Sequence, residues 1–381
     1  MRDVAIIGVG TTVFGKFPRR TVTDMGQEAV QAAIVDAGID RQEIQTAYAS
    51  SVFGGAVLGQ RILSEVGISG IEVLNVENAC AGGATAFRGA WHAVASGLYD
   101  FGLALGVESM TTSPIAGKLI PPEAGDLLGL LGHNMPAHFA FGMRRHMEKY
   151  GTTAQQFARV SVKNHHNGSL NPYSQYKDEL TEEAILSSRM ICDPITLLQC
   201  CPNSDGAAAV ILCPLDMAQK YSAKPVTVAA SVLKMGDYEH RWADWALSDL
   251  TAKCATQAYE IAGLGPEDID VCELHDAFTY SEIAHYEELG FCAQGEGGRL
   301  IDEGATAIGG KTAVNPSGGL LSKGHPVSAT GVAQVAEIVW HLRDEAGKRQ
   351  HPGARVGLAH TMGGEVAGLE CGACAVHILK R

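Results

Sequence analysis

The chain lacks long apolar runs and an excess of positive charge. No stretch reaches the roughly 20 apolar residues that a membrane-spanning helix needs. The formal net charge of −13 argues against a surface for nucleic acid or anionic membrane. Residues 1–20 hold only a short, glycine-broken apolar run with no small-residue cleavage site after it, unlike a signal peptide. We therefore expect a cytoplasmic protein with no nucleic-acid or membrane partner.

A disulfide or metal framework is also missing. The 10 cysteines are scattered along the chain, and in a cytoplasmic protein we expect reduced thiols. Cys371 and Cys374 form a single CxxC, which without a second pair is a weak indication of zinc or redox chemistry. We expect this segment to be a turn that enters a final strand. The "GVG" at 8–10 lacks the third glycine of a dinucleotide-binding loop. We predict no metal and no bound cofactor.

Strand-like and helix-like segments alternate along most of the 381 residues. This alternation predicts an α/β fold, and the chain length predicts two or three structural units. A helix is expected at 24–37, and residues 112–200 break the pattern like a large insertion. The expected strands are at 4–9, 71–76, 101–108, 204–215, 225–232, 354–360 and 374–379.

Two helix-like segments with the same apolar spacing follow glycine-rich loops. Their apolar residues are three, four and three positions apart, which is typical of one helix face. This repetition predicts a duplicated α/β unit. The residues are Ala84, Phe87, Trp91 and Val94 in the first segment, and Val332, Val335, Val339 and Leu342 in the second.

Cys80 lies where a strand-like run turns into the first of these helices, in "NVENACAGGATAF". Free amides at a helix N-terminus favour an anion, so we expect a lowered thiol pKa and a nucleophilic cysteine. We expect the small residues Ala81, Gly82 and Gly83 to leave room for a substrate carbonyl. The alternative is a buried structural cysteine.

Two histidines and a glycine pair are further candidates. His275, in "CELHDAFTYSEI", is either oriented by its neighbours or part of a capped turn. His325 lies between glycine and proline in a non-helical loop, which suits a fixed proton acceptor but also an ordinary turn. The amides of Gly363 and Gly364 in "AHTMGGE" could bind an oxyanion, although most glycine pairs are turns.

Taken together, these motifs resemble the thiolase superfamily, and most of all the branch related to the thiolase domain of sterol carrier protein. The resemblance covers essentially the whole chain in family order. The matching blocks are "ENACAGG", "RRHMEKYGTT", "VKNHHNGSLNPYSQY", "CPNSDGAAAVIL", "ELHDAF", "NPSGGLLSKGHPVSATG" and "GLAHTMGG".

The resemblance implies a five-layered α-β-α-β-α fold made of two similar halves. It places the N-terminal half at residues 1–115 plus 200–222 and the C-terminal half at 223–381. A loop domain at 116–199 would cover the acyl-CoA pocket. The subunit would form a homodimer or homotetramer.

The resemblance also assigns roles. Cys80 would carry the acyl group and His325 would activate it. His275 and His325 would form an oxyanion hole for an enolate. The amides of Cys80 and Gly363 would form a second hole for the acyl-enzyme intermediate.

Three positions depart from the family pattern. The second cysteine of condensing thiolases would align with Thr361 or with Ala277, and neither residue can act as a base. Cys371 is a candidate replacement. The glycine usual after His-Pro-x is Ser328. The nucleophile and both oxyanion holes are therefore expected, and the base for carbon–carbon bond formation is not identified.

The leading prediction is an acyl-CoA acyltransferase of lipid metabolism, either an acetyl-CoA C-acyltransferase or a 3-ketoacyl-CoA thiolase, which uses a Cys80 acyl-enzyme. Its substrates would be coenzyme A thioesters. One alternative is an acyltransferase or carbon–carbon lyase that acts with a small acyl-CoA-binding partner subunit. Another is a non-catalytic lipid- or acyl-CoA-binding protein.

Overall fold

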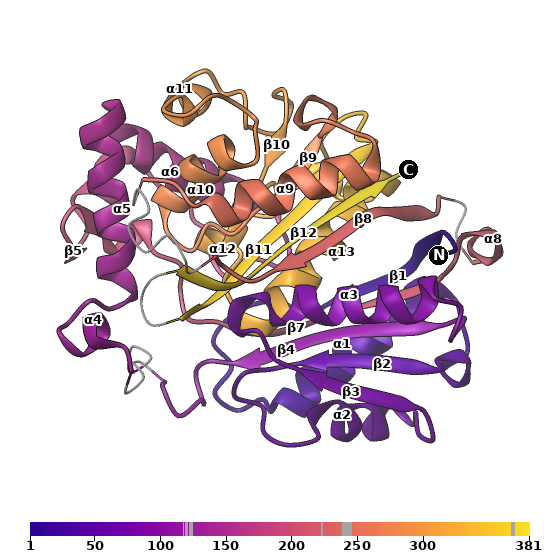
Figure 1. Cartoon of the computed structure of the whole chain (residues 1–381). Helices are drawn as coiled ribbons and strands as arrows, with labels where there is room; N and C mark the ends of the chain where they lie inside the picture. Colours follow the sequence, from indigo (N-terminus) through magenta and orange to yellow (C-terminus); the bar gives the residue numbers. More distant parts are fainter. Residues whose placement is uncertain (117, 119–120, 122–124, 222–223, 238–245, 367–369) are drawn as a thin grey trace.

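The computed structural model describes residues 1–116, 118, 121, 125–221, 224–237, 246–366 and 370–381. A mixed ten-stranded sheet runs through the molecule in the order β10-β9-β11-β12-β8-β1-β7-β4-β2-β3 (Figure 1). Its strands are β1 (Val4–Thr11), β2 (Thr46–Ser50), β3 (Glu72–Val76), β4 (Gly102–Ser109), β7 (Asp205–Pro214), β8 (Val226–Lys234), β9 (Val271–Glu273), β10 (Ala313–Val314), β11 (Val356–Val366) and β12 (Glu370–Lys380).

The sheet consists of two halves with the same topology. Counted outward from the junction, each half contains its first, fifth, fourth, second and third strand in chain order. The first two pairings of each half are antiparallel and the next two are parallel. The halves meet through β1 and β8, where only Ala5 pairs with Thr227 and Ile6 with Val226. This repeat confirms the predicted duplication.

Helices cover both faces of each half, so the layers alternate α-β-α-β-α. Side chains of β1 alternate between two clusters: Ala5 and Ile7 pack toward α1 and α2, and Ile6 packs toward α3 and α13. A third apolar cluster lies between the second half-sheet and α9 and α10. The helices are α1 (Val22–Ala37), α2 (Leu58–Val66), α3 (Gly82–Ala95), α9 (Asp249–Ala262), α10 (Thr279–Glu288) and α13 (Thr330–Arg343).

Between β4 and β7 the chain leaves the ten-stranded sheet and forms a largely helical segment, whose α6 contacts α10, α11 and α12 of the second half. Its elements are α4 (Leu127–Leu130), α5 (Met135–Tyr150), α6 (Ala154–Leu170), α7 (Glu182–Leu186), β5 (Met190–Cys192), β6 (Ile195–Thr196) and η3 (Leu197–Gln199). The other short elements are α8 (Leu215–Ala218), α11 (Gly297–Asp302), α12 (Gly319–Ser322), η1 (Arg41–Glu43), η2 (Ala79–Ala81), η4 (Pro266–Asp268), η5 (Val327–Ala329) and η6 (Gly347–Arg349).

The expected strands and the expected helix at 24–37 are confirmed, with ends that differ by a few residues. One expectation was wrong. Cys371 and Cys374 both lie inside β12, because β11 and β12 form a long antiparallel ladder rather than a turn at this point. The predicted boundary at 222–223 lies outside the described residues. Within the described part of the chain, no helix is long and apolar enough to cross a membrane.

Candidate active site

Cys80 lies in η2, between the end of β3 and the start of α3. The preceding Ala79 has a φ of 48°, a left-handed conformation that is strained for a residue with a side chain. Such strain is typical of functional turns that present a side chain. Cys80 is half-buried.

The glycines after Cys80 serve helix packing. A Cβ at Gly83 would overlap the Ser328 carbonyl and Val332, and one at Gly82 would overlap Ser50. A Cβ at Gly331 would lie 2.5 Å from the Ala84 nitrogen. The expectation that these glycines leave room for a substrate was therefore wrong: the space is filled by the start of α13 and by β2.

His325 lies in the loop between α12 and η5, at the position where α13 approaches α3. Its Nδ1 is 2.7 Å from Thr330 Oγ1, and Thr330 donates its own proton to the Pro326 carbonyl. Nδ1 of His325 is therefore the donor of the pair, and Nε2 is left as a proton acceptor. The backbone N–H of His325 donates to Ser204 Oγ at 3.0 Å, which connects the loop to the segment before β7.

His275 follows β9, and Asp276 beside it does not orient it. The Asp276 carboxylate instead accepts the backbone N–H groups of Leu320 and Leu321 at the start of α12. Asp276 therefore anchors the short helix that leads to His325. Nδ1 of His275 is buried and has no hydrogen-bond partner among the described residues.

The structure brings together the three side chains predicted from the sequence. Cys80 Sγ and one nitrogen each of His275 and His325 lie within 4.8 Å of one another. The two rings meet edge to face, with centroids 5.2 Å apart and an interplanar angle of 82°. The histidines are 6% and 8% exposed, so both are largely shielded from solvent. Cys80 comes from the first half of the fold and both histidines come from the second.

All three groups are neutral at pH 7. Burial raises the pKa of the Cys80 thiol to about 12, helped by Cys371 and Glu108. Burial lowers the pKa of His325 to about 4. Burial, and then His325 and His285, lower the pKa of His275 well below its ordinary value. The expected low thiol pKa was therefore wrong: desolvation at the packed interface of the two halves outweighs the helix N-terminus.

Gly363 lies on β11 directly against the Cys80 backbone. A Cβ there would lie 2.9 Å from the Cys80 nitrogen and closer still to Asn78 and Ala81. The Gly363 amide donates to Cys371 Sγ at 3.2 Å. The Gly363 amide, the predicted oxyanion donor, thus lies beside Cys80. In this structure its hydrogen-bond acceptor is Sγ of Cys371 on the neighbouring strand β12.

The departing positions all lie near the site. The Ala277 carbonyl accepts the N–H of Cys201 at 2.9 Å. Thr361 donates to Gln334 Oε1 at 2.5 Å, so its hydroxyl is engaged with α13. Ser328 is fully buried where α13 meets α3.

Sequence reasoning missed Thr330 and Ser204 and did not place Cys371 near the site. Thr330 and Ser204 lie inside the matching blocks, so their sequence context was a usable signal. Cys371 reaches Gly363 only because β12 pairs with β11, and no local pattern indicates that pairing.

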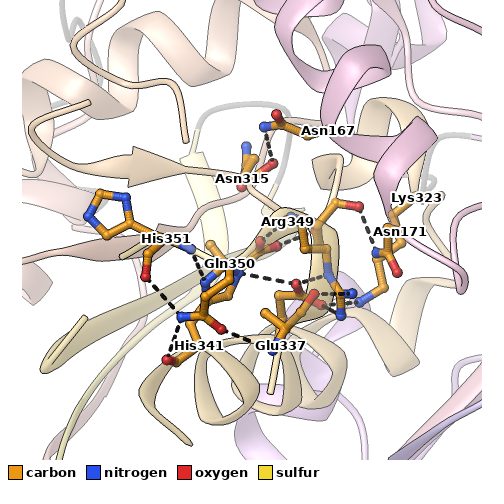
Figure 2. A network of polar contacts seen from close by, with 12 residues as sticks. Asn167, Asn171, Asn315, Lys323, Glu337, His341, Arg349, Gln350 and His351 are labelled. Atoms are coloured by element: carbon orange, nitrogen blue, oxygen red, sulfur yellow. Dashed lines mark hydrogen bonds and ion pairs between the residues drawn. The ribbon is translucent and has the colours of Figure 1, made fainter. Parts of the chain in front are cut away.

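A buried ion cluster of Glu337, Arg349 and Lys323 lies next to the His325 loop. Glu337, in the middle of α13, is fully buried between Arg349 and Lys323, and Figure 2 shows this network. Arg349 donates to Glu337 at 2.5 and 3.1 Å, and Lys323 Nζ lies 4.0 Å away. Burial alone would raise the pKa of Glu337, but Arg349, His341 and Lys323 lower it on balance. Lys323, two residues before His325, is thus held by a fixed charge.

Known proteins show the same architecture. Residues 4–216 match the family model described as thiolase, N-terminal domain, and residues 235–379 match the one described as thiolase C-terminal domain-like. An acetyl-CoA acetyltransferase of Methanothermobacter thermautotrophicus is 44% identical over 388 aligned residues, covering 100% of both chains. Sterol carrier protein 2 of Bos taurus is 42% identical over 94% of this chain and 70% of that protein.

A solved structure described as an Ltp2-ChsH2(DUF35) aldolase superposes with a TM-score of 0.87. It is 26% identical and covers 99% of this chain and 97% of that chain. The chain belongs to the thiolase family. The predicted fold and the predicted class of enzyme, an acyl-CoA acyltransferase of the thiolase type, are confirmed.

Proposed function

We propose that the protein transfers acyl groups from coenzyme A thioesters through a covalent intermediate on Cys80. The observation that carries the proposal is the meeting of Cys80, His275 and His325 within 4.8 Å, from opposite halves of the fold. A thiol, a fixed imidazole acceptor and nearby backbone amides are the groups that thioester exchange needs. The acetyl-CoA acetyltransferase relative supports an acetyl group as the donor.

In the first step, Nε2 of His325 accepts the Cys80 proton as the sulfur attacks the thioester carbonyl. The amides of Cys80 and Gly363 stabilise the oxyanion once that oxygen replaces the Cys371 sulfur as the acceptor of the Gly363 N–H. The coenzyme A sulfur leaves and takes the proton from His325. These steps use only the described side chains and the substrate.

In the second step, the acyl group passes to a carbon nucleophile or back to coenzyme A. His275 and His325 would hold the thioester oxygen of an incoming acetyl-CoA while its enolate forms. The reverse direction is the thiolysis of a 3-ketoacyl-CoA. Because Ala277 and Thr361 cannot act as a base, another group must accept the α-proton.

For domain organisation, we propose the halves at 1–115 plus 200–222 and at 223–381, with residues 116–199 as the loop domain over the acyl-CoA pocket. The position of α4–α7 and of β5 and β6 outside the ten-stranded sheet supports this division. We further propose a homodimer or homotetramer in the cytoplasm. No disulfide joins the cysteines in the described part of the chain, which fits a reducing compartment.

A second candidate is an acyltransferase or carbon–carbon lyase that acts with a small acyl-CoA-binding partner. The aldolase structure, whose description includes a DUF35 component, favours it. The lack of a basic side chain at positions 277 and 361 also favours it. The presence of Cys80 argues against a lyase that works without a covalent cysteine intermediate. A non-catalytic binding protein is the third candidate, and the buried, converging catalytic groups argue against it.

The test is to incubate the purified protein with acetyl-CoA, and separately with acetoacetyl-CoA plus coenzyme A. Peptide mapping locates the adduct and absorbance follows the loss of acetoacetyl-CoA. We expect an acetyl group on Cys80 in the wild type, none in C80A, and a normal adduct in C292A, which removes a half-buried cysteine elsewhere.

An adduct on Cys80 together with thiolysis supports the thiolase activity. An adduct without thiolysis favours the partner-dependent candidate, which adding a DUF35-type protein would then test. No adduct with acetyl, longer and bulkier thioesters would contradict the Cys80 acyl-enzyme and favour the binding protein.

A further inference from the structure

Cys201 lies in a segment that contacts both loops carrying the catalytic histidines, and no step of the proposed reaction uses its thiol. Its backbone N–H donates to the Ala277 carbonyl at 2.9 Å, in the loop that follows β9. Two residues further on, Asn203 forms a parallel β-bridge with His325. The segment 200–204 thus joins the two loops, and Cys201 lies between its contacts with them.

The backbone pairing fixes the direction of the Cys201 side chain. Its N–H bond to Ala277 and the antiparallel bridge between Cys200 and Phe278 put Cys201 directly opposite Ala277. Side chains that are directly opposite in an antiparallel pair lie on the same face, with their Cβ atoms about 5 Å apart. The Cys200 side chain points to the other face, where its thiol donates to the Thr196 carbonyl at 3.4 Å.

The face that Cys201 shares with Ala277 borders the catalytic site. Ala277 lies two residues after His275, at one of the two positions with which the second cysteine of condensing thiolases would align. Its methyl side chain carries no exchangeable proton, so Cys201 is the ionisable member of this residue pair. Burial, and then Cys200 and Cys80, raise the pKa of Cys201 well above its ordinary value. At pH 7 Cys201 is therefore a neutral thiol that holds a proton.

Three other groups near Cys80 or Cys201 could move a proton, and each is held by hydrogen bonds. Cys371 accepts the Gly363 N–H and donates to the Ala373 carbonyl at 2.8 Å. Glu108 accepts three hydrogen bonds from the loop after β2. Asp276 accepts the backbone N–H groups at the start of α12. Each of them would have to give up these bonds to act on a substrate.

We propose that Cys201 is the catalytic proton donor of carbon–carbon bond cleavage: its thiol protonates the α-carbon of the departing acetyl thioester and, in the condensing direction, its thiolate removes that proton. The inference rests on the proposed function and names the group that moves the α-proton, which Ala277 and Thr361 cannot do. It leaves His275 and His325 in the roles already proposed for them.

The step balances with the substrates of the proposed reaction. Cys80 sulfur attacks the 3-keto carbon and gives its proton to Nε2 of His325. The carbon–carbon bond breaks, its electron pair becomes the enolate of acetyl-CoA, and the Cys201 S–H protonates the α-carbon. The Cys201 thiolate then takes the proton of the coenzyme A thiol that enters next. As that thiol takes the acyl group, the Cys80–acyl bond breaks and His325 returns its proton to Cys80.

The experiment compares two routes to the same acetyl group on Cys80, only one of which breaks a carbon–carbon bond. Wild-type protein, C201A, C201S and C200A are each mixed with acetyl-CoA or with acetoacetyl-CoA, without free coenzyme A. Rapid quenching and intact mass follow the acetyl adduct and distinguish it from an acetoacetyl adduct. C201S retains the shape of the side chain and removes the acidic thiol. C200A is the matched control, because it removes the adjacent thiol, which points away from Ala277.

We expect C201A and C201S to slow acetylation by acetoacetyl-CoA roughly 10²–10⁴-fold, as for loss of a general acid, with acetylation by acetyl-CoA nearly unchanged. C200A should behave as the wild type does with both substrates. A wild-type rate of C201A or C201S with acetoacetyl-CoA would overturn the proposal and assign the α-proton to another group. An equal loss with both substrates, or the same loss in C200A, would contradict it by showing an effect on loop structure.

The wild type separates this inference from the proposed function. Acetylation by acetyl-CoA without any by acetoacetyl-CoA would refute the role of Cys201 and leave the Cys80 acyl-enzyme intact. A wild type that forms no adduct from either substrate would count against the proposed function itself.

Discussion

At the scale of the residue, the catalytic pair rests as a neutral thiol and a neutral imidazole. Burial raises the pKa of Cys80 to about 12 and lowers the pKa of His325 to about 4, so an ion pair between them is disfavoured. Proton transfer must therefore accompany attack on the thioester. As a neutral thiol, Cys80 is a weak nucleophile toward other electrophiles.

This arrangement predicts slow alkylation of Cys80 in the free enzyme. Because only the thiolate reacts, the rate with iodoacetamide should rise about tenfold per pH unit from pH 7 to 10, given a pKa of about 12. Peptide mapping at each pH measures it, with C80A as the blank. A rate that levels off near pH 7 would show instead that the thiolate already exists, paired with His325.

Thr330 should matter for acylation although it does not contact the thiol. T330V removes the acceptor that fixes Nδ1 of His325 as the donor, so Nε2 is no longer reliably the base. We expect acylation to slow on the order of 10²-fold, as for a misaligned catalytic group, with little change in KM. T330S retains the hydroxyl and should restore most of the rate. A normal rate in T330V would show that the Pro326 loop alone orients His325.

The residues that carry chemistry could be predicted from sequence, but their charge states could not. Cys80, His275 and His325 lie in short motifs with distinctive neighbours, and the structure places them together. The thiol pKa depends first on burial in the folded chain and then on the charges of Cys371 and Glu108, which are distant in sequence. The contact between His285 and His360 could not be predicted from the sequence either, because α10 and β11 meet only in the folded chain.

At the scale of the element, the starts of α3 and α13 pack so closely that both need glycine. G83A places a methyl group against the Ser328 carbonyl and Val332. Overpacking of this kind typically costs 1–3 kcal/mol, so we expect the free energy of unfolding to fall by about 2 kcal/mol. Because the clash lies beside both catalytic loops, acylation of Cys80 should slow as well.

Urea unfolding and acylation assays measure both effects. G125A is the control, because a Cβ there meets no atom of the described residues within 4 Å. Unchanged stability in G83A would mean that α13 can move away from α3 without cost. In that case the interface would not be what positions His325 against Cys80.

Most elements could be predicted from the spacing of their apolar residues. These residues either lie along one face of a helix or form the continuous apolar run of a fully buried strand. The helix α1 was expected almost to the residue, since Thr21 and Asp24 form a capping box and Gly38 ends it. The strand β12 was predicted too short. Its first residues are polar or small, and only pairing with β11 makes them part of the strand.

At the scale of the whole molecule, the Glu337 cluster ties α13 to the His325 loop and to η6. E337Q would remove the carboxylate that pairs with Arg349 and Lys323 and leave only the more weakly coupled Glu273, a type of change that costs about 3–5 kcal/mol. We expect a loss of that size in the free energy of unfolding at pH 7, measured by urea titration.

The loss should depend on pH in a defined direction. The folded-state pKa of Glu337 is lowered, so its stabilising effect is present above the unfolded-state pKa of about 4.3 and is lost as the pH falls through the folded-state value. The contribution of Glu337 to the difference between wild type and E337Q should therefore shrink below about pH 4. Between pH 7 and 5 the difference also contains the titration of Glu273, whose pKa is raised to about 7 by burial and by Glu337. A difference that grows as the pH falls below 4 would assign the stabilisation to another group.

The repeated topology of the two half-sheets has an evolutionary consequence. Cys80 follows the third strand of the first half, and His325 follows the third strand of the second, so the two occupy equivalent connections. In an ancestor made of two identical half-length chains, both connections would have carried the same side chains, and neither could have specialised for one role. Gene duplication and fusion removed that restriction. Once the copies were joined, each could mutate alone, and the division of labour between nucleophile and base became heritable.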